Sequence, residues 1–220
     1  MLDYAFNYLS MTTRFCIVRH GETAWNAEHR VQGQLNIPLN PTGQWQARAL
    51  GVALAAVRFD ALVCSDLSRA YETALISSSV MDGDIETEVA LRERHYGKFQ
   101  GLKYVEAQQQ FPADFAAHLE RHLDFAYASG ESLQSFAVRV GKVMDALAKK
   151  HKGKTVLVVT HGGCLDVVYR MASGIDLTAP RNFPIPNAAI NWVDYVDGRW
   201  SIVGWADCAH LEATLDEIAE

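Results

Sequence analysis

The sequence predicts an α/β fold with three layers, in which helices cover both faces of a mostly parallel central sheet. Short apolar runs rich in β-branched residues are typical of buried strands, and stretches with apolar residues at helical spacing alternate with them. The succession of a strand, a glycine-containing turn and a helix occurs twice, at RHG in residues 19–21 and at THGG in residues 160–163. This alternation favours a single α/β/α domain.

The first half of the chain supplies two strands and two helices to this fold. An apolar strand is expected at residues 15–18, and Asn40 followed by Pro41 marks the start of a helix that continues through residues 44–57. A second strand is expected at residues 61–64. Apolar residues at helical spacing then predict a helix over residues 66–80.

The second half repeats the alternation. Helical spacing predicts a long helix at residues 132–149, and five mostly β-branched residues predict a strand at 155–159. A helix at residues 166–172 follows the second glycine turn. Two late strands are expected at residues 189–195 and 200–205.

The chain of 220 residues, 49% of them hydrophobic and 21% charged, is the right size for one domain. We divide it into an N-terminal extension at 1–13, a single domain at 14–210 and a C-terminal tail at 211–220. Within the domain, residues 108–130 form an irregular insertion whose apolar residues follow a helical pattern. We expect either a lid or an ordinary packed helix there. The sequence does not indicate the oligomeric state.

Composition excludes several classes of function. A net charge of −6 argues against nucleic acid as a partner, so an anionic ligand should be small. The four cysteines have no zinc-like or disulfide-like spacing, which is typical of reduced thiols in a cytoplasmic protein. No apolar stretch reaches the roughly 20 residues of a membrane span, and the N-terminus does not resemble a signal peptide.

Polar residues with consistent chemistry follow the predicted strands. A phosphate monoester needs cations around its oxygens, a nucleophile in line with the leaving oxygen and a proton donor for that oxygen. Residues of these types are Arg19, His20, Asn26, Arg69, Glu93 and His161. Two histidines and one carboxylate also fit a metal site, but the two arginines would repel a cation, so we expect no metal.

Four motifs carry a resemblance to a known family. RHGETAWN, SDLSRAYETA, LRERHYGKFQG and VVTHGG, in this order, resemble the histidine phosphatase superfamily, which includes cofactor-dependent phosphoglycerate mutases. The resemblance covers about residues 14–210 and implies a phosphoglycerate mutase-like fold. It also implies an enzyme of the cytoplasm that acts on a small phosphorylated metabolite.

The resemblance also implies roles for the site residues. His20 would be the nucleophile that forms a phosphohistidine, because a neutral imidazole offers a lone pair. Glu93 would protonate the leaving oxygen and then accept a proton from water. The catalytic set would be completed by Arg19, Arg69 and His161, which would hold the phosphoryl oxygens. Substrate-binding positions would be Thr23, Asn26, Gln32, Gly33 and Gly162.

Hydrolysis and phosphoryl transfer share this chemistry. Mutases of the family carry a lysine where this chain has Tyr104, usually an asparagine where it has Gly163, and an arginine pair in an insertion that is missing here. We therefore favour a phosphomonoester hydrolase that needs no cofactor. The alternatives are a mutase that uses 2,3-bisphosphoglycerate as phosphoryl donor and a non-catalytic protein that binds phosphorylated ligands. The five tryptophans are interpreted as core residues rather than substrate platforms.

Overall fold

A six-stranded sheet forms the centre of the computed structural model, which describes residues 12–78 and 84–212. The strands are β1 (Thr13–Arg19), β2 (Ala61–Cys64), β3 (Ile85–Thr87), β4 (Thr155–Thr160), β5 (Ile190–Val196) and β6 (Arg199–Asp207). Their order is β3-β2-β4-β1-β5-β6. The first four strands run parallel, whereas β5 is antiparallel to β1 and β6 to β5. The expected α/β fold with a mostly parallel sheet is confirmed.

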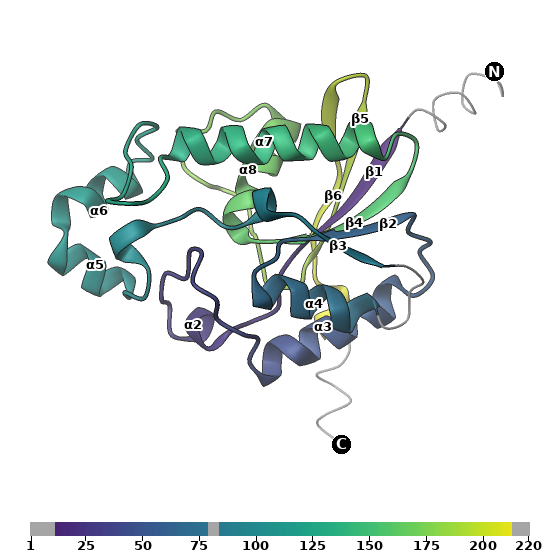
Figure 1. The fold of residues 1–220 in the computed structure, drawn as a ribbon, viewed down its shortest axis with the longest axis horizontal. Helices are drawn as coiled ribbons and strands as arrows, with labels where there is room; N and C mark the ends of the chain where they lie inside the picture. The colour runs from purple at the N-terminus through teal and green to yellow at the C-terminus, as the bar shows by residue number, and fades with distance from the viewer. Residues whose placement is uncertain (1–11, 79–83, 213–220) are drawn as a thin grey trace.

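Helices cover both faces of the sheet (Figure 1). One face carries α3 (Pro41–Leu54) and α4 (Ser68–Ser77), and the other carries α7 (Leu133–Lys150) and α8 (Gly162–Ser173). The shorter helices are α2 (Ala24–Ala27), α5 (Tyr104–Gln110), α6 (Pro112–Leu119) and α9 (Ala209–Glu212), with 3₁₀ turns η2 (Val89–Leu91) and η3 (Gly97–Phe99).

Alternation along the central strands builds a core on each side of the sheet. In β1, Phe15 and Ile17 pack with α7 and α8, whereas Cys16 and Val18 pack with α3 and α4. The residues of β4 divide in the same way. Because both faces are covered, these strands are continuous apolar runs, as expected for parallel strands inside an α/β sheet.

The expected elements differ from the observed ones mainly at their ends. The helix expected at 44–57 begins at Pro41, with the Asn40 side chain accepting a hydrogen bond from the Gly43 amide, and ends at Leu54. The short edge strand β3 was not expected, because its three residues are partly or fully exposed and show no apolar pattern. Residues 1–11 of the predicted extension, 79–80 of the predicted helix and 213–220 of the predicted tail lie outside the described residues.

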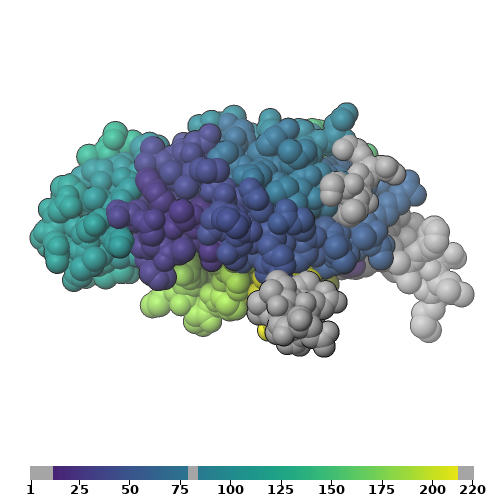
Figure 2. All heavy atoms as spheres, turned by 90° about the horizontal axis from the view of Figure 1, so that it is seen from below, coloured from purple at the N-terminus to yellow at the C-terminus, as the bar shows by residue number. Residues whose placement is uncertain are grey.

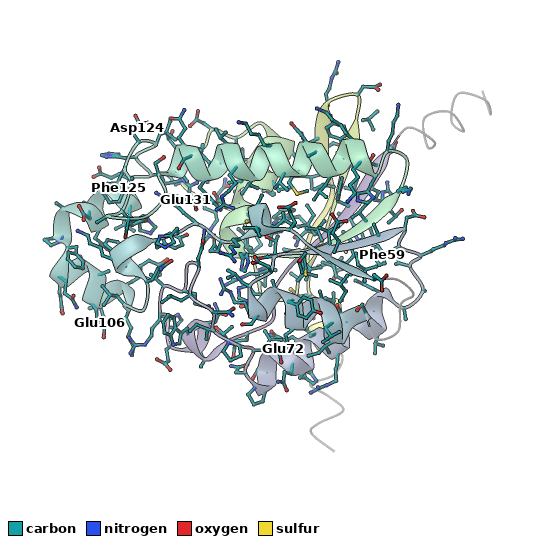
Figure 3. All side chains as sticks on the ribbon, viewed as in Figure 1. Phe59, Glu72, Glu106, Asp124, Phe125 and Glu131 are labelled. Atoms are coloured by element: carbon teal, nitrogen blue, oxygen red, sulfur yellow. The ribbon has the colours of Figure 1, made fainter. Side chains whose placement is uncertain are left out.

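The insertion expected at 108–130 is part of a small helical unit with its own core. Phe99, Phe115 and Tyr127 are buried there together with Val31 and Ala107. Figures 2 and 3 show this unit, which includes α5 and α6, at one end of the molecule, beside the segment that follows β1. Within 108–130 the expected helix is present only as α6, because α5 ends at Gln110 and residues 120–130, which include Leu123 and Phe125, are not helical.

None of the helices in the described ranges is long and apolar enough to cross a membrane.

The start of α3 packs against the loop after β1 through glycines. A Cβ atom on Gly43 would collide with the backbone oxygen of Glu22, and one on Gly21 would lie 2.5 Å from the Gly43 oxygen. Such backbone-to-backbone contact leaves no flexible side chain to move aside. The loop that carries His20 is therefore held at a fixed distance from α3.

We expect Gly43→Ala to lower the free energy of unfolding by about 1–3 kcal/mol, the usual cost of overpacking. The matched control is Gly141→Ala in α7, where the nearest atom to the added Cβ would be the Met171 sulfur at 3.6 Å. That change should be neutral or stabilising, since alanine favours a helix over glycine by about 1 kcal/mol. Urea unfolding of both variants measures the difference, and equal stability would contradict the packing argument.

Candidate active site

Three parallel strands bring three polar side chains to one edge of the sheet. Arg19 pairs with Thr160 in register, and Cys64 pairs with Val159, so Ser65, His161 and His20 follow neighbouring strand ends. The rings of His20 and His161 have centroids 5.3 Å apart. The carboxyl edge of a parallel sheet is where ligands bind in open α/β folds.

Two hydrogen bonds select one tautomer of His20. Its Nδ1 lies 2.7 Å from the Gly21 carbonyl oxygen, which can only accept, so Nδ1 carries the proton. The Nε of Arg69 lies 3.2 Å from His20 Nε2, and a guanidinium can only donate. These two contacts indicate the tautomer in which Nδ1 is protonated and Nε2, which faces Arg69, carries the lone pair.

The surroundings of His20 keep it neutral. Its side chain is only 3% exposed, and burial together with the charges of Arg69 and Arg19 holds its pKa well below the ordinary value of 6.5. The lone pair on Nε2 is therefore available at neutral pH.

Two arginines flank this imidazole. Arg69 is 1% exposed and also donates to the backbone oxygens of Leu35 and Gly33 at 2.8 and 2.7 Å. Burial lowers the pKa of Arg69 to about 10, so it stays charged at neutral pH. Arg19 donates from Nη1 to the Ile185 oxygen, while its buried Nε has no hydrogen-bond partner. The Arg19 pKa is also lowered, chiefly by burial.

Ser65 lies directly beside His161. Its Oγ is 2.8 Å from His161 Nε2 and also accepts from the Leu67 amide at 3.3 Å. The serine hydroxyl can donate to Nε2, and in the tautomer that accepts this bond the imidazole proton is on Nδ1. His161 Nδ1 is buried and unpartnered, so this arrangement gives His161 an unused donor.

Glu93 contacts the start of α8. Its two carboxylate oxygens accept from the backbone amides of Gly163 at 2.9 Å and Arg94 at 2.7 Å. A Cβ atom on Gly163 would collide with the Glu93 carboxylate, so the absence of a side chain at position 163 permits this contact. The glycine at this position is therefore directly linked to the placement of Glu93.

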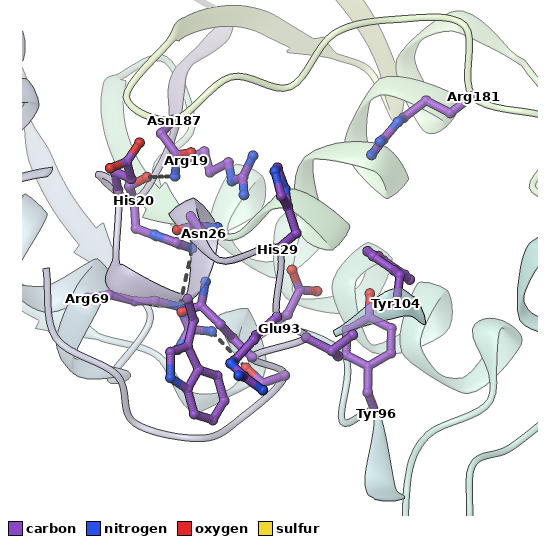
Figure 4. Close-up of a pocket in the computed structure, with 16 residues that line it drawn as sticks. Arg19, His20, Asn26, His29, Arg69, Glu93, Tyr96, Tyr104, Arg181 and Asn187 are labelled. Atoms are coloured by element: carbon purple, nitrogen blue, oxygen red, sulfur yellow. Dashed lines mark hydrogen bonds between the residues drawn. The ribbon is translucent and has the colours of Figure 1, made fainter. Parts of the chain in front are cut away.

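Arg19, His20, Arg69 and Glu93 line a cleft with two lobes (Figure 4), whereas the fully buried Ser65 and His161 lie behind it and line neither lobe. The first lobe, about 440 Å³, contains His20 and Arg69, and the second, about 530 Å³, extends to α6 and α8. Both volumes are typical of small-molecule sites. Five residues line both lobes and form the wall between them: Arg19, Glu93, Tyr96, Tyr104 and Arg181.

The predicted substrate-binding residues do not all line the same part of the cleft. Asn26, Gln32 and Gly33 line the first lobe, and the buried Gln32 Oε1 has no hydrogen-bond partner. Gly162 lines the second lobe instead. Thr23 does not line either lobe, because its fully buried hydroxyl forms a capping box with Asn26 at the start of α2.

Several lining residues were not expected. Trp25, which we assigned to the core, lines the first lobe. Tyr96 and Arg181 come from segments outside the strand ends, and no local pattern distinguishes them from surface residues. Asn187 also lines the first lobe and lies in the loop before β5. Its side-chain amide donates to the His20 backbone oxygen at 2.8 Å.

Within the described residues, no group of three or more histidine, cysteine, aspartate or glutamate side chains is arranged to hold a metal ion. His20, His161 and Glu93 thus do not form the two-histidine, one-carboxylate centre that their types also allow. His20 and His161 are directed by Gly21 and Ser65, and Glu93 by backbone amides.

Comparison with known proteins decides the family. The model of the histidine phosphatase superfamily (branch 1) matches residues 15–208. The chain belongs to the histidine phosphatase superfamily. The resemblance seen in the four motifs is thereby confirmed.

Relatives in the superfamily have names from both reaction types. The Arabidopsis thaliana metal-independent phosphoserine phosphatase is 37% identical over 207 residues, which cover 93% of this chain and 85% of that protein. Phosphoglycerate mutase-like protein 4 of the same organism is 37% identical over 202 residues, covering 90% and 86%. The solved structure of Bacillus stearothermophilus YhfR has a TM-score of 0.83 at 29% identity, covering 90% and 99%.

We expect Gly163→Ala to displace the Glu93 carboxylate and to lower kcat on an alkyl phosphate by about 10²-fold, the lower end of what a misplaced general acid costs. Gly162→Ala is the neighbouring comparison, because its Cβ would meet Arg19 Nε at an ordinary 3.5 Å. That variant keeps its backbone amide and should lose much less. Equal losses in steady-state assays of the two variants would show that the Gly163 contact does not position Glu93.

Proposed function

We propose that this protein is a phosphomonoester hydrolase that acts through a phosphohistidine at His20 on a small phosphorylated metabolite. The observation that carries this proposal is the neutral His20 at the cleft, whose Nε2 lone pair accepts from the buried Arg69 and lies near the partly buried Arg19. A neutral nucleophile beside fixed cations is what attack on an anionic phosphoryl group requires.

In the first step, Nε2 of His20 bonds to phosphorus while the bond from phosphorus to the ester oxygen breaks. Glu93 donates its proton to the leaving oxygen, which departs as an alcohol. In the second step, Glu93 takes a proton from water, the water oxygen bonds to phosphorus, and the bond from phosphorus to Nε2 breaks. Inorganic phosphate leaves, and His20 and Glu93 return to their starting states.

Arg19, Arg69 and His161 would hold the phosphoryl oxygens. Arg19 Nε and His161 Nδ1 are buried donors without partners, so a phosphoryl group would supply their missing acceptor. Asn26 and the Gln32 amide line the same lobe, and an amide group presents either an oxygen or an NH₂ to a ligand. Arginine suits this place because its planar fork matches phosphate oxygens.

The two lobes support hydrolysis with Glu93 as the acid. If the phosphoryl group lies beside His20, the rest of the ester extends into the second lobe, and the bond between them lies near the shared wall. Glu93 belongs to that wall. Its position is therefore suited to a proton transfer at the leaving oxygen.

Hydrolysis is favoured over the mutase reaction by Tyr104 in the shared wall and by Gly163 in the second lobe. Tyr104 occupies the place of the lysine that the mutases carry and lines both lobes. Gly163, where the mutases usually have asparagine, leaves room for the Glu93 carboxylate. The mutase remains the alternative, with 2,3-bisphosphoglycerate as donor, and a non-catalytic ligand-binding protein ranks third because the reactive residues are complete.

No metal or organic cofactor is needed for these steps, since arginines and histidine donors surround the phosphoryl position. One relative at 37% identity is named metal-independent. We also place the protein in the cytoplasm, which its four unpaired cysteines support.

Turnover of 3-phosphoglycerate separates the two reactions. We expect purified protein to release inorganic phosphate from a phosphomonoester panel, with no 2-phosphoglycerate formed whether or not 2,3-bisphosphoglycerate is present. Isomer that appears only with the bisphosphate would establish the mutase instead. EDTA should leave the rate unchanged, and His20→Ala should abolish both turnover and the acid-labile phosphoenzyme.

Glu93→Gln tests the proton donor. Glutamine keeps an oxygen for the Gly163 amide but cannot donate the required proton. Hydrolysis of glycerol phosphate, whose alkoxide is a poor leaving group, should therefore slow by about 10²–10⁴-fold. Hydrolysis of p-nitrophenyl phosphate should slow far less, because its leaving group departs without protonation. Equal slowing of the two esters would contradict the role of Glu93.

A further inference from the structure

The cleft carries more positive charge than one phosphoryl group neutralises. Six arginines line its two lobes, namely Arg19, Arg30, Arg69, Arg94, Arg121 and Arg181, against three carboxylates, Glu22, Glu93 and Asp166. A phosphate monoester brings about −1.5 to −2 charges. Arg30 and Arg121 already pair with carboxylates, so the arginines without a carboxylate partner are Arg19, Arg69, Arg94 and Arg181, more than one phosphoryl group can pair with.

Arg181 is the available cation. Arg30 and Arg121 form ion pairs with carboxylates, and Arg19, Arg69 and Arg94 donate to backbone oxygens. For Arg181, the structure records no hydrogen bond or ion pair with any described residue, and its side chain is exposed. Figure 4 shows it pointing into the cleft, on the side opposite Arg69.

The backbone near Arg181 is well anchored although its side chain is free. Two residues later, the buried Phe183 ring stacks on Tyr169 at 3.7 Å with an interplanar angle of 18°. Four residues earlier, the Leu177 oxygen accepts from Arg121 Nε at 2.7 Å. The loop thus places the exposed Arg181 guanidinium in the shared wall of the two lobes.

Neutral donors lie across the cleft from Arg181. Tyr96 and Tyr104 line both lobes, and the structure gives their hydroxyls no hydrogen-bond partner among the described residues. Both hydroxyls are donors at neutral pH, because the ordinary tyrosine pKa is about 10 and desolvation raises that of Tyr96 further. A cation and two unpartnered hydroxyls around one space are suited to an anionic oxygen group.

We propose that Arg181 binds a second anionic group on the substrate, so that the preferred esters are phosphorylated acids whose leaving group carries a carboxylate or a further phosphate. The statement about preferred esters rests on the proposed hydrolase function. The statement that Arg181 binds a second anionic group does not depend on that function.

Binding to a His20→Ala background tests the subsite without turnover. The probes are 3-phosphoglycerate and glycerol 3-phosphate, which share a three-carbon skeleton and differ by a carboxylate in place of a hydroxymethyl group. Calorimetry should give about tenfold tighter binding of the carboxylate, the effect of one charge-assisted hydrogen bond. Adding Arg181→Gln should remove that preference, and Arg181→Lys should keep part of it.

Arg199→Gln is the matched control, since Arg199 begins β6 and lines neither lobe. It should leave the preference unchanged. The comparison is repeated with propane-1,3-diol monophosphate and bisphosphate, in which the second anionic group is a phosphate. The two ligand pairs together show whether the subsite prefers a carboxylate or a phosphate. If His20→Ala does not melt cooperatively, His20→Asn provides the background.

Equal binding of the members of both ligand pairs, or a preference that survives Arg181→Gln, would overturn the subsite. Phosphate release by the unaltered protein is measured separately on the same esters. A binding preference without any phosphate release would overturn the hydrolase and keep the subsite. Phosphate release without a binding preference would overturn the subsite and keep the hydrolase.

Discussion

The parallel pairing of β2, β4 and β1 is the constraint on which the rest of the site depends. Because the three strands end in register, Ser65, His161 and His20 emerge side by side, and each fixes or faces the next. A slip of one residue in β1 would send His20 to the other face of the sheet. The apolar alternation that divides the core between two helix layers prevents such a slip, so the packing of the core and the placement of His20 have the same origin.

The second requirement is to keep buried cations charged beside a neutral histidine. Arg69 is almost fully buried without a carboxylate partner, which is costly unless its donors are satisfied. Backbone oxygens of Gly33 and Leu35 satisfy two of them and hold the guanidinium toward His20. Carbonyls rather than carboxylates are suitable partners here, because they leave the positive charge uncompensated for a phosphoryl group. The loop at 32–35 is therefore as important to the site as the strand ends.

Sequence patterns predicted the elements and residues whose positions follow from local periodicity. They missed the cleft residues that are contributed by segments far apart in the sequence. His20 and His161 follow long apolar strands, so their common edge was predictable, whereas the three exposed residues of β3 carry no periodic signal. Thr23 belongs to the same motif as His20, yet its hydroxyl serves the local cap of α2. Arg181 and Tyr96 reach the cleft only through loop packing, which no spacing within their own segments records.

The shared wall between the lobes explains how one group can serve both halves of a hydrolysis. Once the alcohol leaves, the second lobe is vacated and water reaches the same side of phosphorus, where Glu93 already stands as a carboxylate. A mutase must instead retain a bisphosphate there long enough to return the phosphoryl group. Of the four arginines that line the lobe of about 530 Å³, Arg19, Arg94 and Arg121 already have partners, so Arg181 alone is available to a second anionic group, without the further cations that a mutase uses to retain a bisphosphate. Because this cleft has fewer free cations for a bisphosphate, we expect water to reach the phosphohistidine before the phosphoryl group returns, which is the physical basis for a phosphatase built on a site that both reactions share.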